Sequence, residues 1–268
     1  MAVLRMVATD LDGTFLSSDG TASAENIDAA LSAANRGIKL VFATGRPSRW
    51  LQVLQPLAMA HPQVLSSNGA VTFDLQTHTV IDYDPVPIAE TIAVAKDLRA
   101  AMPEIAFAVE YTQGWGRDNR FPVRGDRVEA DVQGDVEHLL TQRIAVKLLA
   151  VGWGIDTHRM ADLAMPISQG RLNCTFSMIT EHGLMELSAI GVDKASGLRK
   201  LMAADQIRPD ELAAFGDMPN DIPMLEMAGH GFAMANAHPS LLKRFRVAGN
   251  HNESGFARTL RRLLDESD

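Results

Sequence analysis

Cysteine is almost absent from this chain. Cys174 is the one cysteine among 268 residues, so no disulfide can form within the chain, and the disulfide-stapled secreted folds are excluded. Cys174 stands in the strand-like run 172–176, where a thiol is typical of a strand position rather than of a nucleophile. A single thiol fits a reducing compartment, and we expect a cytoplasmic protein.

Long apolar runs and an excess of basic residues are absent too. The longest apolar run, 144–151, is interrupted by Lys147 and is far shorter than the ~18 residues that span a bilayer. Residues 1–6 lack the charged start and the apolar stretch of an export signal. The net charge of −8 is spread along the chain, which argues against a duplex-binding surface. We therefore expect neither a membrane nor a nucleic acid as partner.

The length of the chain and the order of its predicted strands and helices indicate two domains. At 268 residues it exceeds a typical domain of ~100–200 residues, and short buried strands alternate with helices at both ends but not in the middle. We predict a core domain formed by residues 1–84 and 189–268, and an inserted α+β domain over 85–188. The strand, helix, strand order at both ends predicts an α/β core, a Rossmann-like parallel sheet with helices on both faces.

The first strand ends in acidic residues. An apolar run over 3–7 leads to Asp10, Asp12, Gly13 and Thr14. Two carboxylates this close repel each other, so at least one needs a proton or a cation. Aspartate and glycine also form ordinary turns, and these residues alone leave both interpretations open. The functional interpretation gives one aspartate the role of nucleophile and metal ligand, and the other that of proton donor and acceptor.

Three further predicted strands end in polar residues. The carboxyl ends of parallel strands meet at one edge of a sheet, so these residues are expected to lie together. Each also has a structural alternative, such as a helix cap for Thr44 or a hairpin turn for Asn68. The predicted strand ends carry Thr44 and Gly45, then Asn68, then Asp217, Asn220 and Asp221.

A lysine completes the predicted site. Lys194 opens a predicted helix over 193–204, where its charge opposes the helix macrodipole. A bound phosphate would remove that conflict, although a solvated surface lysine is the simpler interpretation. Carboxylate oxygens suit Mg²⁺, so the aspartates at the strand ends predict a site for a hard cation. Together with Lys194, the polar residues there predict an anion site beside it.

These motifs, in the order in which they follow one another along the chain, resemble those of the haloacid dehalogenase-like hydrolases. More narrowly, they resemble those of the Cof-type phosphatases with a C2 cap. The resemblance covers both ends of the chain, with the insert in the C2 position. Met218-Pro219 departs from the small residue of many relatives, which bears on the shape of the metal loop. The matching stretches are Asp10–Thr14, Thr44–Arg46, Ser67–Ala70, Lys194, Gly216–Asp217 and Asn220–Asp221.

The resemblance implies a Mg²⁺-dependent phosphatase acting on small phosphorylated metabolites, sugar phosphates first. It makes Asp10 the nucleophile that forms an aspartyl-phosphate and Asp12 the acid and base. It assigns phosphate binding to Thr44, Gly45, Asn68, Lys194 and Asn220, and metal binding to Asp10, to Asp12 through its backbone carbonyl and to Asp217. Asp221 is either a further metal ligand or an acceptor behind the ligands.

Alternatives stay open at this point. They are a phosphomutase of the same superfamily and a phospho-accepting signalling or binding module. Arg46 either reaches the substrate or pairs within the fold, and the protein is expected to be a monomer or a homodimer. The candidate specificity residues of the insert are Trp115, Arg117, Arg120, Arg124 and His138.

Overall fold

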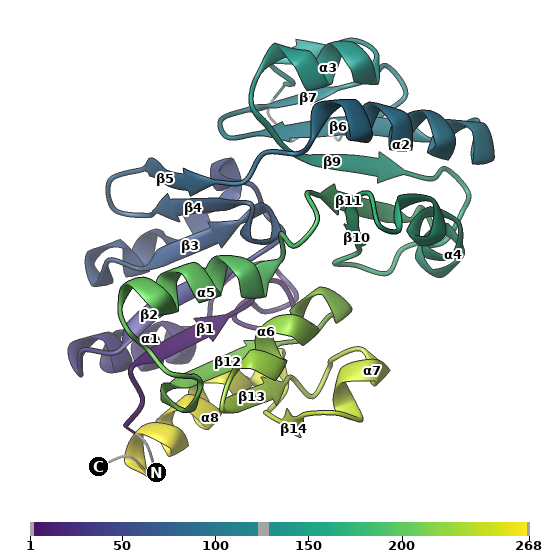
Figure 1. Cartoon of the computed structure of the whole chain (residues 1–268). Helices are drawn as coiled ribbons and strands as arrows, with labels where there is room; N and C mark the ends of the chain where they lie inside the picture. Colours follow the sequence, from purple (N-terminus) through teal and green to yellow (C-terminus); the bar gives the residue numbers. More distant parts are fainter. Residues whose placement is uncertain (1–2, 123–128, 267–268) are drawn as a thin grey trace. The chain divides into compact units, whose positions relative to one another are not determined.

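The computed structural model describes residues 3–122 and 129–266. Two compact units make up the chain (Figure 1): residues 1–82 together with 193–268 form the core unit, and residues 83–192 form the inserted unit. The sequence-based boundaries lie two residues from the first division and four from the second.

The core unit is built on a mixed, mainly parallel sheet. Among the described residues it has eight strands in the order β14-β13-β12-β1-β2-β3-β4-β5. Strand β1 lies in the middle and pairs in parallel with β12 and β2. The strands are β1 (Met6–Thr9), β2 (Lys39–Ala43), β3 (Gln63–Ser66), β4 (Val71–Asp74), β5 (Thr79–Tyr83), β12 (Leu212–Gly216), β13 (His230–Ala233) and β14 (Arg246–Val247).

Helices pack on both faces of this sheet. Residues of α1 and α8 share one buried apolar cluster with Val7 and Phe215, and residues of α5 and α6 share another with Ala8 and Ala214. Neighbouring strand residues point to opposite faces, so these two clusters lie on the two sides of the sheet. The helices are α1 (Ala24–Asn35), α5 (Lys194–Ala204), α6 (Ile222–Met227), α7 (Pro239–Leu242) and α8 (Gly255–Asp265).

Local sequence explains where α1 begins and ends. The Ser23 hydroxyl accepts the backbone N–H of Asn26, which satisfies one of the free donors at the first turn. Gly37 follows with φ +78°, a conformation that ends helices because it costs glycine little. Ile27, Ala30, Leu31 and Ala34 repeat at helical spacing and predict a helix over 23–36, which the structure confirms.

After Pro47, which can open a helix, the apolar residues Trp50, Leu51, Leu54 and Leu57 predict an α-helix with one apolar side. The segment corrects that prediction. It forms consecutive 3₁₀ helices instead. Pro56 stands inside the second one and has no N–H to donate, so a regular α-helix would lose a hydrogen bond there. The 3₁₀ helices of the core unit are η1 (Ser48–Trp50), η2 (Gln52–Ala60), η3 (Ser67–Gly69), η4 (Pro209–Glu211), η5 (Pro219–Asp221) and η6 (His251–Glu253).

The inserted unit is an α+β layer. Its described strands form one sheet in the order β10-β11-β9-β6-β7-β8, against which α3 and α4 pack, and α2 packs on both of these helices. The elements are α2 (Ile88–Ala101), β6 (Ala106–Tyr111), β7 (Trp115–Arg117), β8 (Val132–Gln133), α3 (Val136–Gln142), β9 (Ala145–Val151), α4 (Thr157–Ser168), β10 (Asn173–Thr175) and β11 (Leu184–Ser188). The predicted fold class, a parallel-sheet core with an α+β insert, is confirmed.

No helix in the described part of the chain is both long and apolar enough to cross a membrane.

Candidate active site

Asp10 stands directly after the central strand β1. Its backbone N–H donates to the Phe215 carbonyl at 3.0 Å, which continues the ladder between β1 and β12. Asp10 itself is buried, with 5% of its surface exposed. A rigid, two-sided sheet therefore fixes the backbone of this carboxylate, as the sequence predicts.

Asp217 occupies the equivalent place after β12. Its Oδ1 accepts the Thr14 hydroxyl at 3.0 Å. The turn after β1 passes so close that a Cβ on Gly13 would lie 2.4 Å from Asp217 Oδ2, and Gly13 also has φ +76°. Glycine is needed at position 13 for both reasons, because it lets the turn after β1 pack against Asp217.

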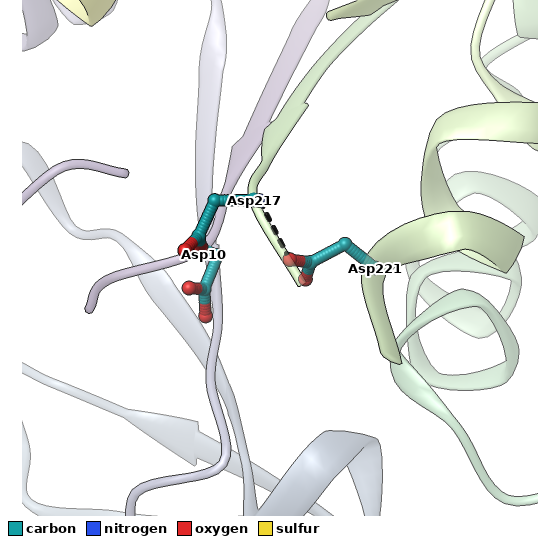
Figure 2. A group of neighbouring side chains, drawn as sticks. All are labelled: Asp10, Asp217 and Asp221. Atoms are coloured by element: carbon teal, nitrogen blue, oxygen red, sulfur yellow. Dashed lines mark hydrogen bonds between the residues drawn. The ribbon is translucent and has the colours of Figure 1, made fainter. Parts of the chain in front are cut away.

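Asp221 is held by three donors. Its Oδ2 accepts the backbone N–H groups of Asp217 at 2.9 Å and Met218 at 3.0 Å, and its Oδ1 accepts from Lys194 at 2.5 Å. Figure 2 shows its bond to the Asp217 backbone. The unusual Met218-Pro219 pair is therefore compatible with an ordered loop, in which the Met218 amide itself orients Asp221.

Lys194 is the first residue of α5 and is almost fully buried. The Asp193 side chain caps this helix by accepting the Ser196 N–H at 2.6 Å. The Lys194 ammonium donates to Asp10 Oδ1 at 2.6 Å as well as to Asp221. Burial disfavours its charge, but the two carboxylates outweigh that effect and raise the pKa of Lys194 above its ordinary value.

The carboxylates of Asp10, Asp217 and Asp221 form one buried cluster (Figure 2), with one oxygen of each within 4.8 Å of the others. Burial raises the pKa of Asp10 well above its usual range, Lys194 lowers it in part, and Asp221 raises it again. Burial and the Asp221 charge raise the pKa of Asp217 to about 7. Three carboxylates against one ammonium carry a formal charge of −2 when all are ionised. Such an all-oxygen, electron-rich cluster fits a hard divalent cation.

Asp12 lies apart from this cluster and pairs with Arg46. The Arg46 guanidinium donates to both carboxylate oxygens of Asp12, at 2.7 and 2.6 Å, in the bidentate geometry that arginine favours. The side chain of Asp12 is 55% exposed. Of the two roles that the sequence leaves open for Arg46, the structure therefore shows pairing within the fold.

The predicted phosphate-binding residues gather at the ends of β2 and β3. The Asn68 backbone N–H donates to the Thr44 carbonyl at 2.8 Å, and the Asn220 amide donates to the Asn68 side chain at 3.2 Å. The Thr44 hydroxyl accepts the Arg46 backbone N–H at 3.0 Å rather than capping a helix. Gly45 lies between Thr44 and Arg46 in this loop.

Gly69 joins this loop to the helix that carries Lys194. A Cβ at position 69 would lie 2.2 Å from the Asp193 carbonyl, and φ at Gly69 is +90°. The preceding Asn68 is also left-handed, with φ 60°, a conformation that asparagine tolerates. The Asn68-Gly69 pair, expected as a hairpin turn, therefore also allows the start of α5 to approach.

The candidate specificity residues of the insert have local partners. Trp115 packs edge-on against Phe121, Arg120 donates to the Pro103 carbonyl at 2.5 Å, and Arg117 donates to the Asp118 carbonyl at 3.4 Å. His138 lies in α3 next to Gln142. Arg124 lies outside the described residues.

Sequence reasoning missed two features. The structure gives Thr14 a direct contact with Asp217, and it places a buried charged pair, Lys147 and Glu186, in the insert. Lys147 interrupts the apolar run 144–151, and that interruption was the available signal.

Comparison with known proteins decides the family. A family model described as haloacid dehalogenase-like hydrolase matches residues 7–260. The chain belongs to this family. It is 30% identical to phosphatase YwpJ of Bacillus subtilis, over 97% of this chain and 100% of that one.

The chain is also similar to a second curated protein and shares its fold with a solved structure. Pyridoxal phosphate phosphatase YbhA of Escherichia coli is 27% identical, over 92% of this chain and 94% of that one. The solved structure of a haloacid dehalogenase-like hydrolase from B. subtilis shares the fold, with a TM-score of 0.81 at 22% identity over 97% of this chain and 100% of that one. This haloacid dehalogenase-like chain is a phosphatase of the Cof type, and its superfamily uses a divalent metal.

Proposed function

We propose that the chain is a Mg²⁺-dependent phosphatase that hydrolyses small phosphorylated metabolites through an aspartyl-phosphate on Asp10. The observation that carries the proposal is the buried cluster of Asp10, Asp217 and Asp221 with Lys194 between two of them. Residues from both ends of the chain converge there, at the carboxyl ends of β1 and β12. This convergence suits a reaction whose catalysis is mainly positioning and charge stabilisation.

In the first step, a carboxylate oxygen of Asp10 attacks the phosphorus of a phosphomonoester. The bond from phosphorus to the leaving oxygen breaks, and Asp12 gives that oxygen a proton. In the second step, a water oxygen attacks the phosphorus of the aspartyl-phosphate and Asp12 takes a proton of that water. The bond from phosphorus to the Asp10 oxygen breaks, so that inorganic phosphate leaves and the Asp10 carboxylate is restored. The Asp12 side chain is 55% exposed, so substrate and water can reach it in turn, while Arg46 holds the carboxylate in place by donating to both oxygens.

The metal would be held by Asp10 and Asp217, with the backbone carbonyl of Asp12 as the family pattern implies. When bound, Mg²⁺ neutralises charge on the transferring phosphoryl group. Asp221 serves this site indirectly, since its two oxygens already accept from Lys194 and from backbone N–H groups. Lys194, Thr44, Asn68 and Asn220 would hold the phosphoryl oxygens, together with the backbone of the Thr44-Gly45 loop.

Sugar phosphates are the first expected substrates, and cofactor phosphates follow. The name of the YbhA relative, a pyridoxal phosphate phosphatase, supports a small phosphorylated molecule as the substrate class. We keep the cytoplasmic location and the monomeric or homodimeric state as predictions.

The test is phosphate release over a panel of phosphomonoesters, with Mg²⁺ or with EDTA. We expect metal-dependent release that is lost in Asp10→Asn and strongly reduced in Asp12→Asn. Phosphomonoester hydrolysis is among the reactions that enzymes accelerate most, by up to ~10²¹, so the loss should be large. Asp82→Asn is the matched control, because Asp82 is an exposed carboxylate that pairs with Lys200.

Two results would reject this proposal. Phosphate release by Asp10→Asn at the wild-type rate would show that Asp10 is not the nucleophile. Phosphate release that EDTA does not reduce would show that the reaction does not depend on a metal. Wild-type turnover in Asp12→Asn would reject only the acid and base role of that residue.

A further inference from the structure

The loop after β13 contacts both loops that carry the proposed catalytic carboxylates. The Asn236 side-chain amide donates to the Gly13 carbonyl at 2.8 Å, and the His238 backbone N–H donates to the Asp217 carbonyl at 2.8 Å. Asn236 is a polar residue just beyond the end of β13, yet the reaction outlined above gives it no role. These residues all lie in the core unit.

The orientation of the Asn236 amide is fixed by its two partners. Its Oδ1 accepts the His251 backbone N–H at 3.2 Å. A backbone N–H can only donate and a backbone carbonyl can only accept, so the NH₂ group must face Gly13. An aspartate at position 236 would keep the bond to His251 but would place a carboxylate against the Gly13 carbonyl.

Gly13 has little room to move in response. A Cβ on it would already overlap Asp217 Oδ2, and the next residue, Thr14, donates to the same carboxylate. The Gly13 carbonyl, held by Asn236, fixes the remaining side of this peptide. Contacts on both sides therefore set the backbone immediately after Asp12.

Hydrogen bonds also hold the other end of the turn that begins at Asp10. The Ser18 N–H donates to Asn252 Oδ1 at 2.8 Å, and the Ser18 hydroxyl lies 3.0 Å from His251 Nε2. The turn from Asp10 to Ser18 is thus fastened near both ends by residues 236–252. Loss of Asn236 would release the end near Asp12 while Ser18 stays held.

We propose that Asn236 is a positioning residue that acts on Asp12 through the Gly13 carbonyl. The inference rests on the proposed phosphatase reaction. More than half of the Asp12 side chain is exposed, so packing contributes little to its position. Arg46 holds the carboxylate end by donating to both oxygens, and the backbone that follows Asp12 sets the other end. Correct placement matters, because misplacing a catalytic group by about 1 Å can cost roughly 10²-fold in rate.

The test compares Asn236→Ala and Asn236→Asp with Asn26→Ala. Asn26 is a matched control, since its amide also donates to a backbone carbonyl, that of Phe15 at 2.8 Å, and accepts a backbone N–H, that of Ala257 at 3.1 Å. The first variant removes both Asn236 bonds, and the second keeps the bond to His251, which favours folding. Melting temperatures confirm that all three are folded at the assay temperature.

The readout is kcat/KM with Mg²⁺ for phenyl phosphate and for 2,4-dinitrophenyl phosphate. The phenolate needs a proton from Asp12 as it leaves, whereas the dinitrophenolate does not. Both Asn236 variants should lose about 10- to 100-fold with phenyl phosphate but less than about 3-fold with the dinitrophenyl ester. Asn26→Ala should lose melting temperature and change kcat/KM equally for the two substrates, by no more than about 3-fold.

The outcomes separate this inference from the proposed function. Equal losses for the two substrates in the Asn236 variants, or wild-type values in Asn236→Asp, would overturn the positioning role while the phosphatase reaction stands. An inactive wild-type protein with both esters would reject the proposed function and this inference with it.

Discussion

The Lys194 ammonium lies 2.6 Å from Asp10 Oδ1, although 184 positions separate the two residues in the chain. Both side chains are less than 10% exposed. Taking two charges out of water is costly, and the attraction between them offsets that cost only when the geometry is good. The pair is therefore better understood as part of a charged reaction site than as a device for stability.

Lys194→Met should destabilise the metal-free protein by roughly 3–5 kcal/mol, because it leaves Asp10 and Asp221 buried without their counter-charge. Phosphatase activity should also fall by at least ~10²-fold, since the variant loses a charge aimed at the transferring group. Mg²⁺ should restore part of the stability by supplying positive charge to the same carboxylates. Melting temperatures with EDTA and with Mg²⁺, together with phosphate release, measure these effects.

Lys200→Met provides the comparison. Lys200 and Asp82 form an exposed ion pair, and such pairs contribute less than about 1 kcal/mol. Equal melting temperatures for the Lys194 and Lys200 variants in EDTA would show that the buried cluster does not depend on Lys194.

Stability of the metal-free protein should fall as the pH rises from about 4 to about 7. The pKa of Asp217 is raised from 3.8 to about 7, so between these values the folded state binds more protons than the unfolded state. The contribution of the Asp217 proton is complete below the unfolded pKa and is lost as the pH passes the folded one. Melting temperatures in EDTA across this range measure the slope.

The matched variant is Asp217→Asn, which cannot titrate at this position. It should flatten the slope without abolishing it, because the pKa of Asp10 is raised too. A slope as steep as that of the wild-type protein would contradict the role of Asp217.

The strand ends show how far the sequence leads. Asp10, Thr44 and Asp217 each follow an apolar run, and the rule that parallel strands end at one edge is enough to bring them together. The pairing of Arg46 with Asp12 is different, because it depends on the angle at which the Thr44 loop leaves the sheet. No local pattern encodes that angle. The bond of the Asn236 amide was hidden for a different reason: its partner is a backbone carbonyl, a group that every residue has.

Gly69→Ala should cost roughly 2–4 kcal/mol, because it adds left-handed strain and an overlap with the Asp193 carbonyl. Gly37→Ala should cost about 1 kcal/mol, since φ is similar but no atom lies within 4 Å of the new Cβ. Melting temperatures of the two variants give the comparison. Equal decreases in melting temperature for the two variants would mean that α5 moves away from residue 69 with no loss of stability.

Cys174 should react slowly with iodoacetamide. Burial raises the pKa of its thiol to about 11, so at pH ~8 the thiolate fraction is roughly 200-fold smaller than for a free thiol near 8.5. Mass spectrometry of the folded protein over time measures the rate, and the same protein unfolded in guanidinium provides the control. Modification of the folded protein as fast as of the unfolded one would show that Cys174 is accessible.

The buried pair of Lys147 and Glu186 predicts a strong coupling inside the inserted unit. The Lys147 ammonium lies 3.0 Å from Glu186 Oε2, and both side chains are less than 5% exposed. The Arg99 guanidinium of α2 lies over the Phe107 ring, so Phe107 points toward the helices, and alternation along β6 turns Glu110 to the other face. Lys147 is directly opposite Glu110 in the register, so the charges gather on the sheet face away from the helices.

Lys147→Met should therefore destabilise the inserted unit by roughly 3–5 kcal/mol, because Glu186 stays buried without its cation. Adding Glu186→Gln to Lys147→Met removes the unpaired buried charge and should recover a measurable part of the lost stability. If the two sites were independent, the destabilising effects of the two substitutions would simply add. Lys96→Met is the control in the same unit, since the Lys96–Glu137 pair is exposed and contributes less than about 1 kcal/mol. Hydrogen exchange of amides in β9 and β11 reports the stability of this unit directly. If Lys147→Met and Lys96→Met accelerated that exchange equally, burial would not be what makes the Lys147 pair matter.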